Sequence, residues 1–421
     1  MFSELSISRS ELYEKWIDRI LWLTIVLVPI VILPYGVSDI FDAIKGPILV
    51  LSGIAILLFL ILNKKWEKSI ITGLLVTYIS LVLLASIFAH DPLLAFAGAT
   101  NYGGRFEGFA TISIYILLFY ASRNYLIVTK QKLIRALSFL LIVSIYSLVQ
   151  YYQFDPLVIY KNYRPMIFST IGNQNFLGSL MVILSSLTFG LSVFYRKWYY
   201  FLFFTLFFSS LLASQTRGSW IAFGIVFIGL TLLILLFYRT KILGVLIALT
   251  LMIFVALVLN YSKKNALSNR TNSIKTEIKM KNEYGGSGRF KIWEITWGVI
   301  KDHPLLGTGP ENLKSVLKTE YKKELNAYYR MKGVTIDKAH NEYLHMAAVS
   351  GIPSLIVYLL LIGVIFWQNI PRMSKDKTKL IIGFAVFGYL VQAFSNISVI
   401  AVAPIFWILF GYFSRKSKEV C

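Results

Sequence analysis

The sequence predicts an all-α, polytopic membrane bundle of about twelve transmembrane helices, with one large helical segment outside the membrane. Its 421 residues are 57% hydrophobic and only 15% charged, whereas soluble domains are roughly 45–50% apolar and about 25% charged. Apolar runs long enough to cross about 30 Å of hydrocarbon recur along the chain. These runs lack the alternation of barrel strands, so their backbone hydrogen bonds must close within helices.

The apolar runs define the predicted spans in chain order. Twelve segments qualify, namely residues 19–36, 44–63, 69–89, 108–127, 134–153, 175–195, 198–213, 218–237, 241–259, 345–367, 379–396 and 399–414. The run at 198–213 is short and the last two runs almost touch. Eleven or thirteen spans therefore also fit the pattern.

The short connections between these runs predict the orientation of the chain. With a cytoplasmic N-terminus, the inner connections carry 21 Lys and Arg and the short outer ones carry five. Such an excess of basic residues marks the cytoplasmic side of a membrane protein. We therefore expect a multi-pass protein of the cytoplasmic (inner) membrane with both termini in the cytoplasm.

The net charge and the cysteine content exclude two other classes of protein. A formal net charge of +21 would indicate a nucleic-acid partner only if the basic residues clustered on one soluble face. Half of them lie in the inner connections, so we expect no nucleic acid. The single cysteine, Cys421, excludes a disulfide framework.

One long connection divides the chain into three predicted parts. Residues 1–259 form a first membrane bundle, residues 260–344 an extracytoplasmic segment, and residues 345–421 a second bundle with a cytoplasmic tail. The extracytoplasmic segment holds 16 Lys and Arg and nine acidic residues, a net charge of +7. This charge suits an anionic partner, or equally a solvated face beside anionic headgroups.

The extracytoplasmic segment shows a helical pattern. Phe290, Trp293, Trp297 and Ile300 recur at helical spacing, and the pattern stops at Asp302–Pro304. We expect an amphipathic helix here, with its aromatic side chains packed against a neighbour or at the headgroup boundary.

The residues that could carry chemistry gather at the predicted outer rim. The membrane interior is almost free of ionisable groups, whereas ion-coupled transporters and proton pumps keep such groups at mid-bilayer depth. The rim candidates are Arg105, Arg164, Arg217, Arg289 and His340, with Asn173 and Asn175. A rim site suits chemistry on a lipid headgroup.

Two of the rim arginines are placed to hold an anion. Arg217 lies in a very short outer turn, Ser214–Trp220, where its planar fork could hold a phosphate, although it could equally extend from the helix end to water. Arg289 follows Gly285–Gly288 and opens a predicted helix. It could present its side chain and the helix N-terminal amides to one anion, or simply be a solvated cation.

His340 is the candidate for proton transfer. Imidazole titrates near neutral pH, and only four histidines occur in the chain; a solvated loop histidine is the alternative. His340 and His345 differ by roughly 140° around a helix, and the His-Glu-x-x-His order is absent. We therefore expect no metal ion, and the glycines near Arg105 lack the Lys-Ser/Thr of a nucleotide loop.

Several segments together resemble the O-antigen ligase and polymerase superfamily of bacterial membrane glycosyltransferases. The resemblance covers about residues 165–410 and rests on the order and spacing of Ile171–Phe176, Gln215–Gly218, Gly288–Trp293, Asp302–Gly309, Ala339–Leu344, and Tyr389–Gln392 with Pro404–Trp407. It implies a transferase that takes a glycan from undecaprenyl diphosphate at the outer membrane surface. The acceptor would be an unidentified hydroxyl of a lipid, glycan or protein, and membrane lipids would surround the site.

The resemblance also implies residue roles and a mechanism. It makes Arg217, Arg289 and His340 the catalytic residues, with no metal or other cofactor. We assign substrate contacts to Arg105, Arg164, Asn173, Asn175 and Tyr343, although the asparagines serve equally well as turn formers. The expected reaction is direct displacement at the anomeric carbon with inversion.

Three alternatives remain at this point. A polymerase joining lipid-linked repeat units shares the chemistry, and the sizeable single outer segment with its one re-entry histidine favours a ligase. A polysaccharide or lipid transporter would need a polar path through the membrane, and a structural scaffold gives no reason for rim Arg and His. If the transferase prediction holds, Arg217, Arg289 and His340 should converge on one outward-opening cleft.

Overall fold

A computed structural model describes residues 8–33, 40–99, 106–155, 167–262, 268, 272, 288–373 and 376–415. Across these residues the chain forms sixteen α-helices, two short 3₁₀ turns and no strand. The predicted substrate contacts Arg105 and Arg164 lie outside the described residues.

The helices follow the apolar runs of the sequence. In chain order they are α1 (Arg9–Ile30), α2 (Asp42–Asn63), α3 (Ile70–Ile87), α4 (Pro92–Ala97), α5 (Phe109–Tyr125), α6 (Lys130–Tyr151), α7 (Gln174–Tyr195), α8 (Trp198–Ala213), α9 (Arg217–Phe237), α10 (Ile242–Ser262), α12 (Arg289–Asp302), α13 (Leu313–Thr319), α14 (Lys322–Lys332), α15 (Glu342–Met373), α16 (Lys377–Ala393) and α17 (Ala403–Phe413). Each predicted run overlaps one of these helices.

Seven helices in the described part are long and apolar enough to cross a membrane, namely α2, α3, α6, α7, α9, α10 and α15, and α8 and α17 are shorter apolar helices. The predicted all-α polytopic membrane bundle is therefore confirmed. The total of about twelve spans stays a prediction.

The bundle is built around α7. Every residue of its most apolar window is buried, and the helix packs against α8, α9, α10 and α16. Gly178 and Gly190 let these neighbours approach, because a Cβ on Gly178 would lie 2.2 Å from Thr216 Oγ1 and one on Gly190 would lie 2.9 Å from the Ile381 side chain. Close packing on small residues is typical of membrane helices.

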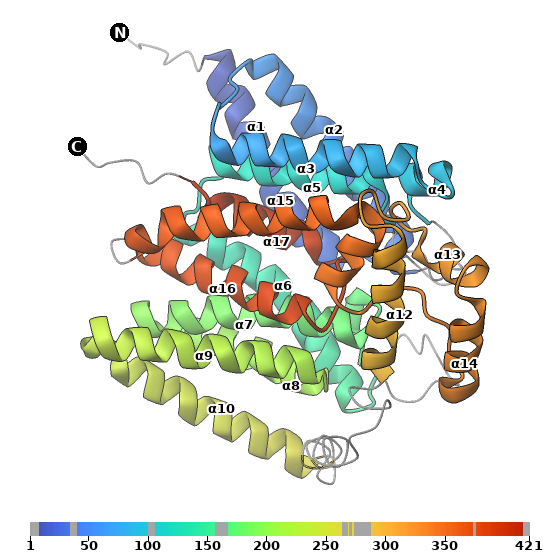
Figure 1. Cartoon of the computed structure of the whole chain (residues 1–421). Coiled ribbons are helices and arrows are strands. Elements are labelled where there is room, and N and C mark those ends of the chain that lie inside the picture. Colours follow the sequence, from blue (N-terminus) through green and yellow to red (C-terminus); the bar gives the residue numbers. More distant parts are fainter. Residues whose placement is uncertain are drawn as a thin grey trace.

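The two ends of the bundle differ. In Figure 1, α1 begins and α17 ends at one end, whereas α12, α13 and α14 lie at the other. These three helices share a small core with the start of α15, in which Ile292, Val299, Leu317 and Leu325 are buried beside Ala348. The predicted helix over Phe290–Ile300 is present, but its buried face is aliphatic, and Phe290 and Trp297 are 55% and 50% exposed.

Helix α15 is kinked near its start. Gly351 has φ 83° and ψ 161°, a backbone region that is essentially restricted to glycine. The preceding turn pairs with this part of the helix, since Thr308 N–H donates to Ala348 O (2.9 Å) and Ile352 N–H donates to Pro304 O (2.8 Å). The kink separates residues 342–350, which closely follow His340, from the long part of the helix.

Replacing Gly351 with alanine should destabilise the protein by about 1–3 kcal/mol, because the new residue would adopt a backbone conformation that side chains rarely tolerate. Its Cβ would also lie 1.9 Å from Leu305 O. Thermal unfolding in detergent will measure the change. Gly363→Ala in the same helix is the control, since its Cβ meets nothing within 4 Å; equal melting temperatures for the two variants would contradict the expectation.

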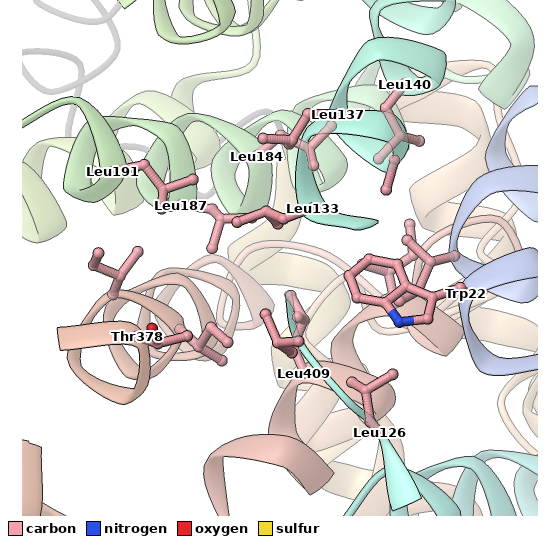
Figure 2. Close-up of a pocket in the computed structure, with 16 residues that line it drawn as sticks. Trp22, Leu126, Leu133, Leu137, Leu140, Leu184, Leu187, Leu191, Thr378 and Leu409 are labelled. Carbon is pink, nitrogen blue, oxygen red and sulfur yellow. The ribbon is translucent and has the colours of Figure 1, made fainter. Parts of the chain in front are cut away.

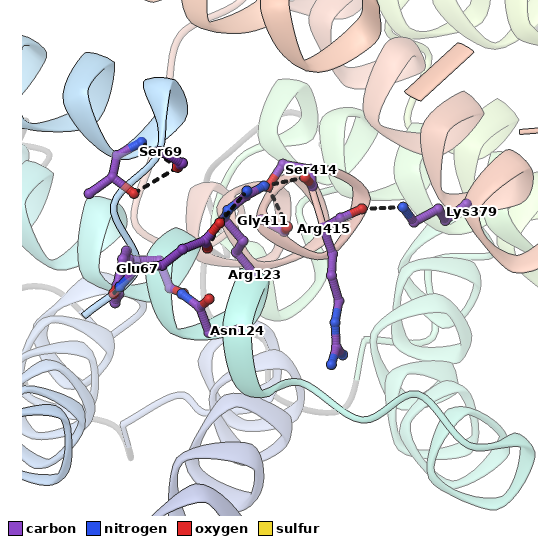
Figure 3. A network of polar contacts seen from close by, with 10 residues as sticks. Glu67, Ser69, Arg123, Asn124, Lys379, Gly411, Ser414 and Arg415 are labelled. Carbon is purple, nitrogen blue, oxygen red and sulfur yellow. Dashed lines mark hydrogen bonds and ion pairs between the residues drawn. The ribbon is translucent and has the colours of Figure 1, made fainter. Parts of the chain in front are cut away.

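A polar network fastens the end of the bundle where α5 and α17 finish (Figure 3). Arg123 is buried and pairs with Glu67 through Nη2 to Oε1 (2.9 Å) and Nε to Oε2 (3.1 Å). It also donates to the carbonyl and hydroxyl of Ser414. Buried Lys379 donates to Asn369 Oδ1 (3.1 Å) and to Arg415 O. Some of the basic residues counted for topology are therefore structural as well.

Replacing Arg123 with alanine should cost about 2–4 kcal/mol, because it leaves buried acceptors without their donor. The matched control is Lys65→Ala, which removes an exposed ion pair with Glu14 and should cost less than about 1 kcal/mol. Unfolding free energies of the two variants in detergent test this difference. Similar losses for both would show that burial of the Arg123 pair contributes nothing.

Candidate functional site

The described residues line pockets of contrasting chemistry. Figure 2 shows an apolar pocket between α1, α6, α7, α16 and α17, whose sixteen lining residues include only the Thr378 hydroxyl and the Trp22 indole as polar groups. The Trp22 N–H already donates to Ile127 O (3.3 Å). This pocket can hold only an apolar group.

A second pocket is polar and basic. Its lining comprises Asn175, Thr216, Arg217, Gly218, Ser219, Arg289, Gln392 and Ser395. Three helices begin at this pocket, since Asn175 is the second residue of α7, Arg217 the first of α9 and Arg289 the first of α12. Helix N-termini present unpaired amide groups and a partial positive charge. Two guanidinium groups beside three such termini form a site suited to an anion.

The turn before α9 sets the position of Arg217. Gln215 has φ 52°, and the hydroxyls of Ser214 and Thr216 lie 2.8 Å apart. The residue after Arg217 is Gly218. A larger residue does not fit there, because a Cβ would lie 1.8 Å from Ser395 Oγ. This close approach brings the C-terminal end of α16 against the start of α9 and completes the pocket wall.

The two predicted asparagines have different roles. The Asn173 side chain accepts from Asn175 N–H (2.8 Å) and caps α7, so it acts as a turn former in this structure. Asn175 lines the pocket, and its backbone oxygen accepts from Asn396 Nδ2 (3.1 Å). Asn396 also donates to Ser179 Oγ (2.6 Å) and ties the loop after α16 to α7.

His340 is not among the residues that line this pocket. It has φ 49° and precedes the kinked start of α15. The following residues contact the pocket end of α16, since Tyr389 OH donates to Glu342 Oε2 (3.0 Å) and Tyr343 OH donates to Leu390 O (2.7 Å). The Tyr343 ring also packs on Phe394, next to Ser395. The structure thus brings Arg217, Arg289 and Asn175 together and fixes the His340 segment to the same end of α16.

A buried ionic network supports the His340 segment from the other side. Lys338 pairs with Glu311 at 2.7 Å, and both side chains are at most 5% exposed. Glu311 Oε1 accepts from Glu107 N–H (3.3 Å), and Glu107 Oε1 accepts from the hydroxyls of Tyr115 (2.9 Å) and Ser398 (2.8 Å). Burial raises the pKa of Glu107 to about 7, although Lys338 and the two hydroxyls act in the opposite direction.

Sequence patterns gave no indication of this network or of Ser395, and they mark Gln392 only as part of the segment Tyr389–Gln392 that carries the resemblance. Glu107 and Glu311 are 204 residues apart, and each alone has the pattern of a solvated loop charge. Ser395 lies at the end of an apolar run. Only its close contact with Gly218 in the folded protein identifies it as a residue of the pocket. Within the described ranges, no group of three His, Cys, Asp or Glu side chains forms a potential metal site.

Comparison with known proteins matches part of the chain to a family. Residues 201–359 match the family model described as O-Antigen ligase. The matched region runs from α8 into α15 and includes Arg217, Arg289 and His340. No curated protein matches the chain.

Proposed function

We propose that the protein is a membrane glycosyltransferase, from the premise that residues 201–359 match the O-antigen ligase family model. It transfers a glycan from undecaprenyl diphosphate to an acceptor hydroxyl on a lipid, glycan or protein. The reaction takes place on the outer face of the cytoplasmic membrane. The basic inner connections support this orientation, because the Arg217–Arg289 pocket lies at the end of the bundle that carries α12.

One observation carries the proposal: Arg217 and Arg289, 72 residues apart in the chain, line one small pocket at three helix N-termini. A glycosyl transfer from this donor releases a diphosphate, whose negative charge grows as the bond to the anomeric carbon breaks. Fixed cationic donors stabilise such charge in the transition state. The arginines thereby take the part that a metal ion plays in other diphosphate-releasing enzymes.

His340 completes the proposed chemistry. Its imidazole removes the proton from the acceptor hydroxyl, or holds that hydroxyl for attack, as the oxygen forms a bond to the anomeric carbon. The bond to the diphosphate breaks in the same step, so the anomeric configuration inverts. Glu342 and Tyr343, which follow His340 and contact α16 near Gln392, support its approach to the donor.

The family contains enzymes that ligate finished glycans and enzymes that polymerise repeat units. The substantial outer segment with α12, α13 and α14 favours a ligase here, and Arg105, Arg164, Asn173, Asn175 and Tyr343 remain proposed substrate contacts.

Purified protein in lipid nanodiscs, given an undecaprenyl-diphosphate glycan and a panel of acceptors, tests the function. Transfer of the whole glycan to one acceptor is the expected result. A ladder of lipid-linked oligomers from a single-repeat donor would identify a polymerase, and absence of transfer with every donor and acceptor would contradict both.

A further inference from the structure

The carboxyl group of Glu342 is buried without a cation beside it. Glu342 is the first residue of α15, two positions after His340, and it is only 8% exposed. Its Oε2 accepts a hydrogen bond from the Tyr389 hydroxyl of α16 (3.0 Å). Among the described residues, no ion pair includes Glu342. A buried carboxylate without a compensating charge is costly, so such a group favours its neutral, protonated form.

The surroundings of Glu342 add negative charge. Groups from four helices and from the segment before α5 interact with it electrostatically, namely Tyr78, Tyr115, Tyr343, Tyr358, Tyr389 and Glu107. Tyrosine hydroxyls keep their protons near neutral pH. The charged group of this set is therefore Glu107, and two carboxylates that face each other in a poorly solvated site do not both ionise readily.

The two carboxyl groups differ in how well a negative charge is stabilised. Glu107 accepts from two hydroxyl groups (2.9 and 2.8 Å) and is attracted by Lys338. Glu342 accepts from one hydroxyl group. The charge of Lys338 is itself offset by Glu311, which lies 2.7 Å away. Of the two carboxyls, Glu107 is thus the better place for the negative charge, and Glu342 is the one that holds a proton.

We propose that Glu342 is a positioning residue that acts as a neutral acid: its protonated carboxyl, held by Tyr389, fixes the start of α15 against α16 and thereby sets the position of His340. The inference rests on the proposed function, because it gives the proposed base its place. Ionisation of Glu342 would put an uncompensated charge between the two helices, beside Glu107. The start of α15 would then separate from α16, and His340 would move with it.

The pH dependence of glycan transfer tests this protonation state. Buried glutamates without a cation ionise at about pH 8–9, so the wild-type kcat should fall by roughly tenfold between about pH 7 and about pH 9.5. Glu342→Gln provides a neutral group of similar shape whose oxygen still accepts from Tyr389. Its rates at the two pH values should therefore agree within about twofold, since no carboxyl remains there to ionise.

A second variant separates the hydrogen bond from the charge. Glu342→Leu is neutral but leaves the buried Tyr389 hydroxyl without its acceptor, so its kcat should be about tenfold below that of Glu342→Gln at both pH values. A rate in Glu342→Gln as low as that in Glu342→Leu would show that the negative charge is the active form. An alkaline decline in Glu342→Gln as steep as that of the wild type would assign the decline to another group. Either result overturns the proposal.

The matched control is Glu294→Gln. It makes the same chemical change on α12, where the Glu294 carboxylate is 66% exposed and pairs with Lys291 (2.9 Å). This variant should keep the alkaline decline of the wild type. Loss of the decline in Glu294→Gln as well would show that the decline reports the overall charge of the outer segment, and would contradict a specific role of Glu342.

Thermal unfolding tests the protonated carboxyl without any substrate. In the unfolded chain a glutamate ionises at about pH 4.3, whereas the folded protein keeps the Glu342 proton to a higher pH. The folded state then binds more protons than the unfolded state across this window, so its stability falls as the pH rises through it. Glu342→Gln is free of this loss, and its melting temperature relative to the wild type should increase from about pH 5 to about pH 8.

The corresponding difference for Glu294→Gln should stay constant, because an exposed carboxylate ionises alike in the folded and unfolded states. A constant difference for Glu342→Gln as well would refute the protonated carboxyl, even where transfer is normal. An increasing difference in a protein that transfers no glycan would keep the protonated carboxyl and remove the proposed function.

Discussion

Replacing His340 with alanine should lower the rate of glycan transfer by roughly 10²–10⁴-fold, the usual contribution of a general base. The acceptor hydroxyl would then attack the anomeric carbon while still carrying its proton. Initial rates with a fluorescent lipid-linked glycan at saturating donor will measure the loss. Donor binding should change little, because the diphosphate is held by the arginines.

The conformation of His340 calls for a second variant. Its φ of 49° is tolerated by asparagine better than by alanine, so His340→Asn preserves the backbone while removing the imidazole. Both variants should therefore show the same loss of transfer rate. His303→Ala is the control, since His303 lies in the outer segment, where its Nε2 lies 3.0 Å from Glu320 Oε2. Turnover near the wild-type rate in His340→Asn would remove the imidazole from the mechanism.

Replacing Arg217 with lysine should reduce kcat/KM by about 10²-fold or more, comparable to the loss of one transition-state hydrogen-bond donor in acyl-transfer enzymes. Lysine retains the positive charge but cannot reproduce the planar pair of donors. Arg217 is also the first residue of α9, where its side chain and the helix amides face the same pocket. Arg217→Ala should be at least as severe.

Binding of undecaprenyl diphosphate, measured by calorimetry, should weaken in both Arg217 variants. Arg239→Lys is the control, because Arg239 lies in the turn between α9 and α10, and its Nε donates to Leu235 O. Undiminished diphosphate affinity together with normal transfer in Arg217→Lys would place the diphosphate elsewhere.

Hydropathy predicted the membrane helices well because lipid imposes the same requirement on every span, a long apolar segment whose backbone hydrogen bonds close within a helix. The apolar run at 345–367 did not reveal that the helix begins at Glu342 and kinks at Gly351. That kink depends on backbone hydrogen bonds to Pro304 and Thr308. Hydropathy has no term for such contacts between distant segments.

The candidate site was partly predictable for a similar reason. Arg217 and Arg289 stand out because a charge beside an apolar run is conspicuous, and their meeting in one pocket followed from the resemblance and not from spacing. Gln392 lies within α16 and Ser395 lies just after it. Both residues are neutral, so composition does not identify them as residues of a site. The pairing of Lys338 with Glu311 depends on how the outer segment folds back, which periodicity does not describe.

The contact of α5 with α17 has a consequence for biosynthesis. Ser122 Oγ donates to Ile408 O, and Arg123 donates to Ser414, across 286 and 291 residues of chain. The ribosome must therefore add all of these intervening residues before the donors on α5 can meet their native acceptors. The contact between α5 and α17 therefore forms late relative to the synthesis of α5.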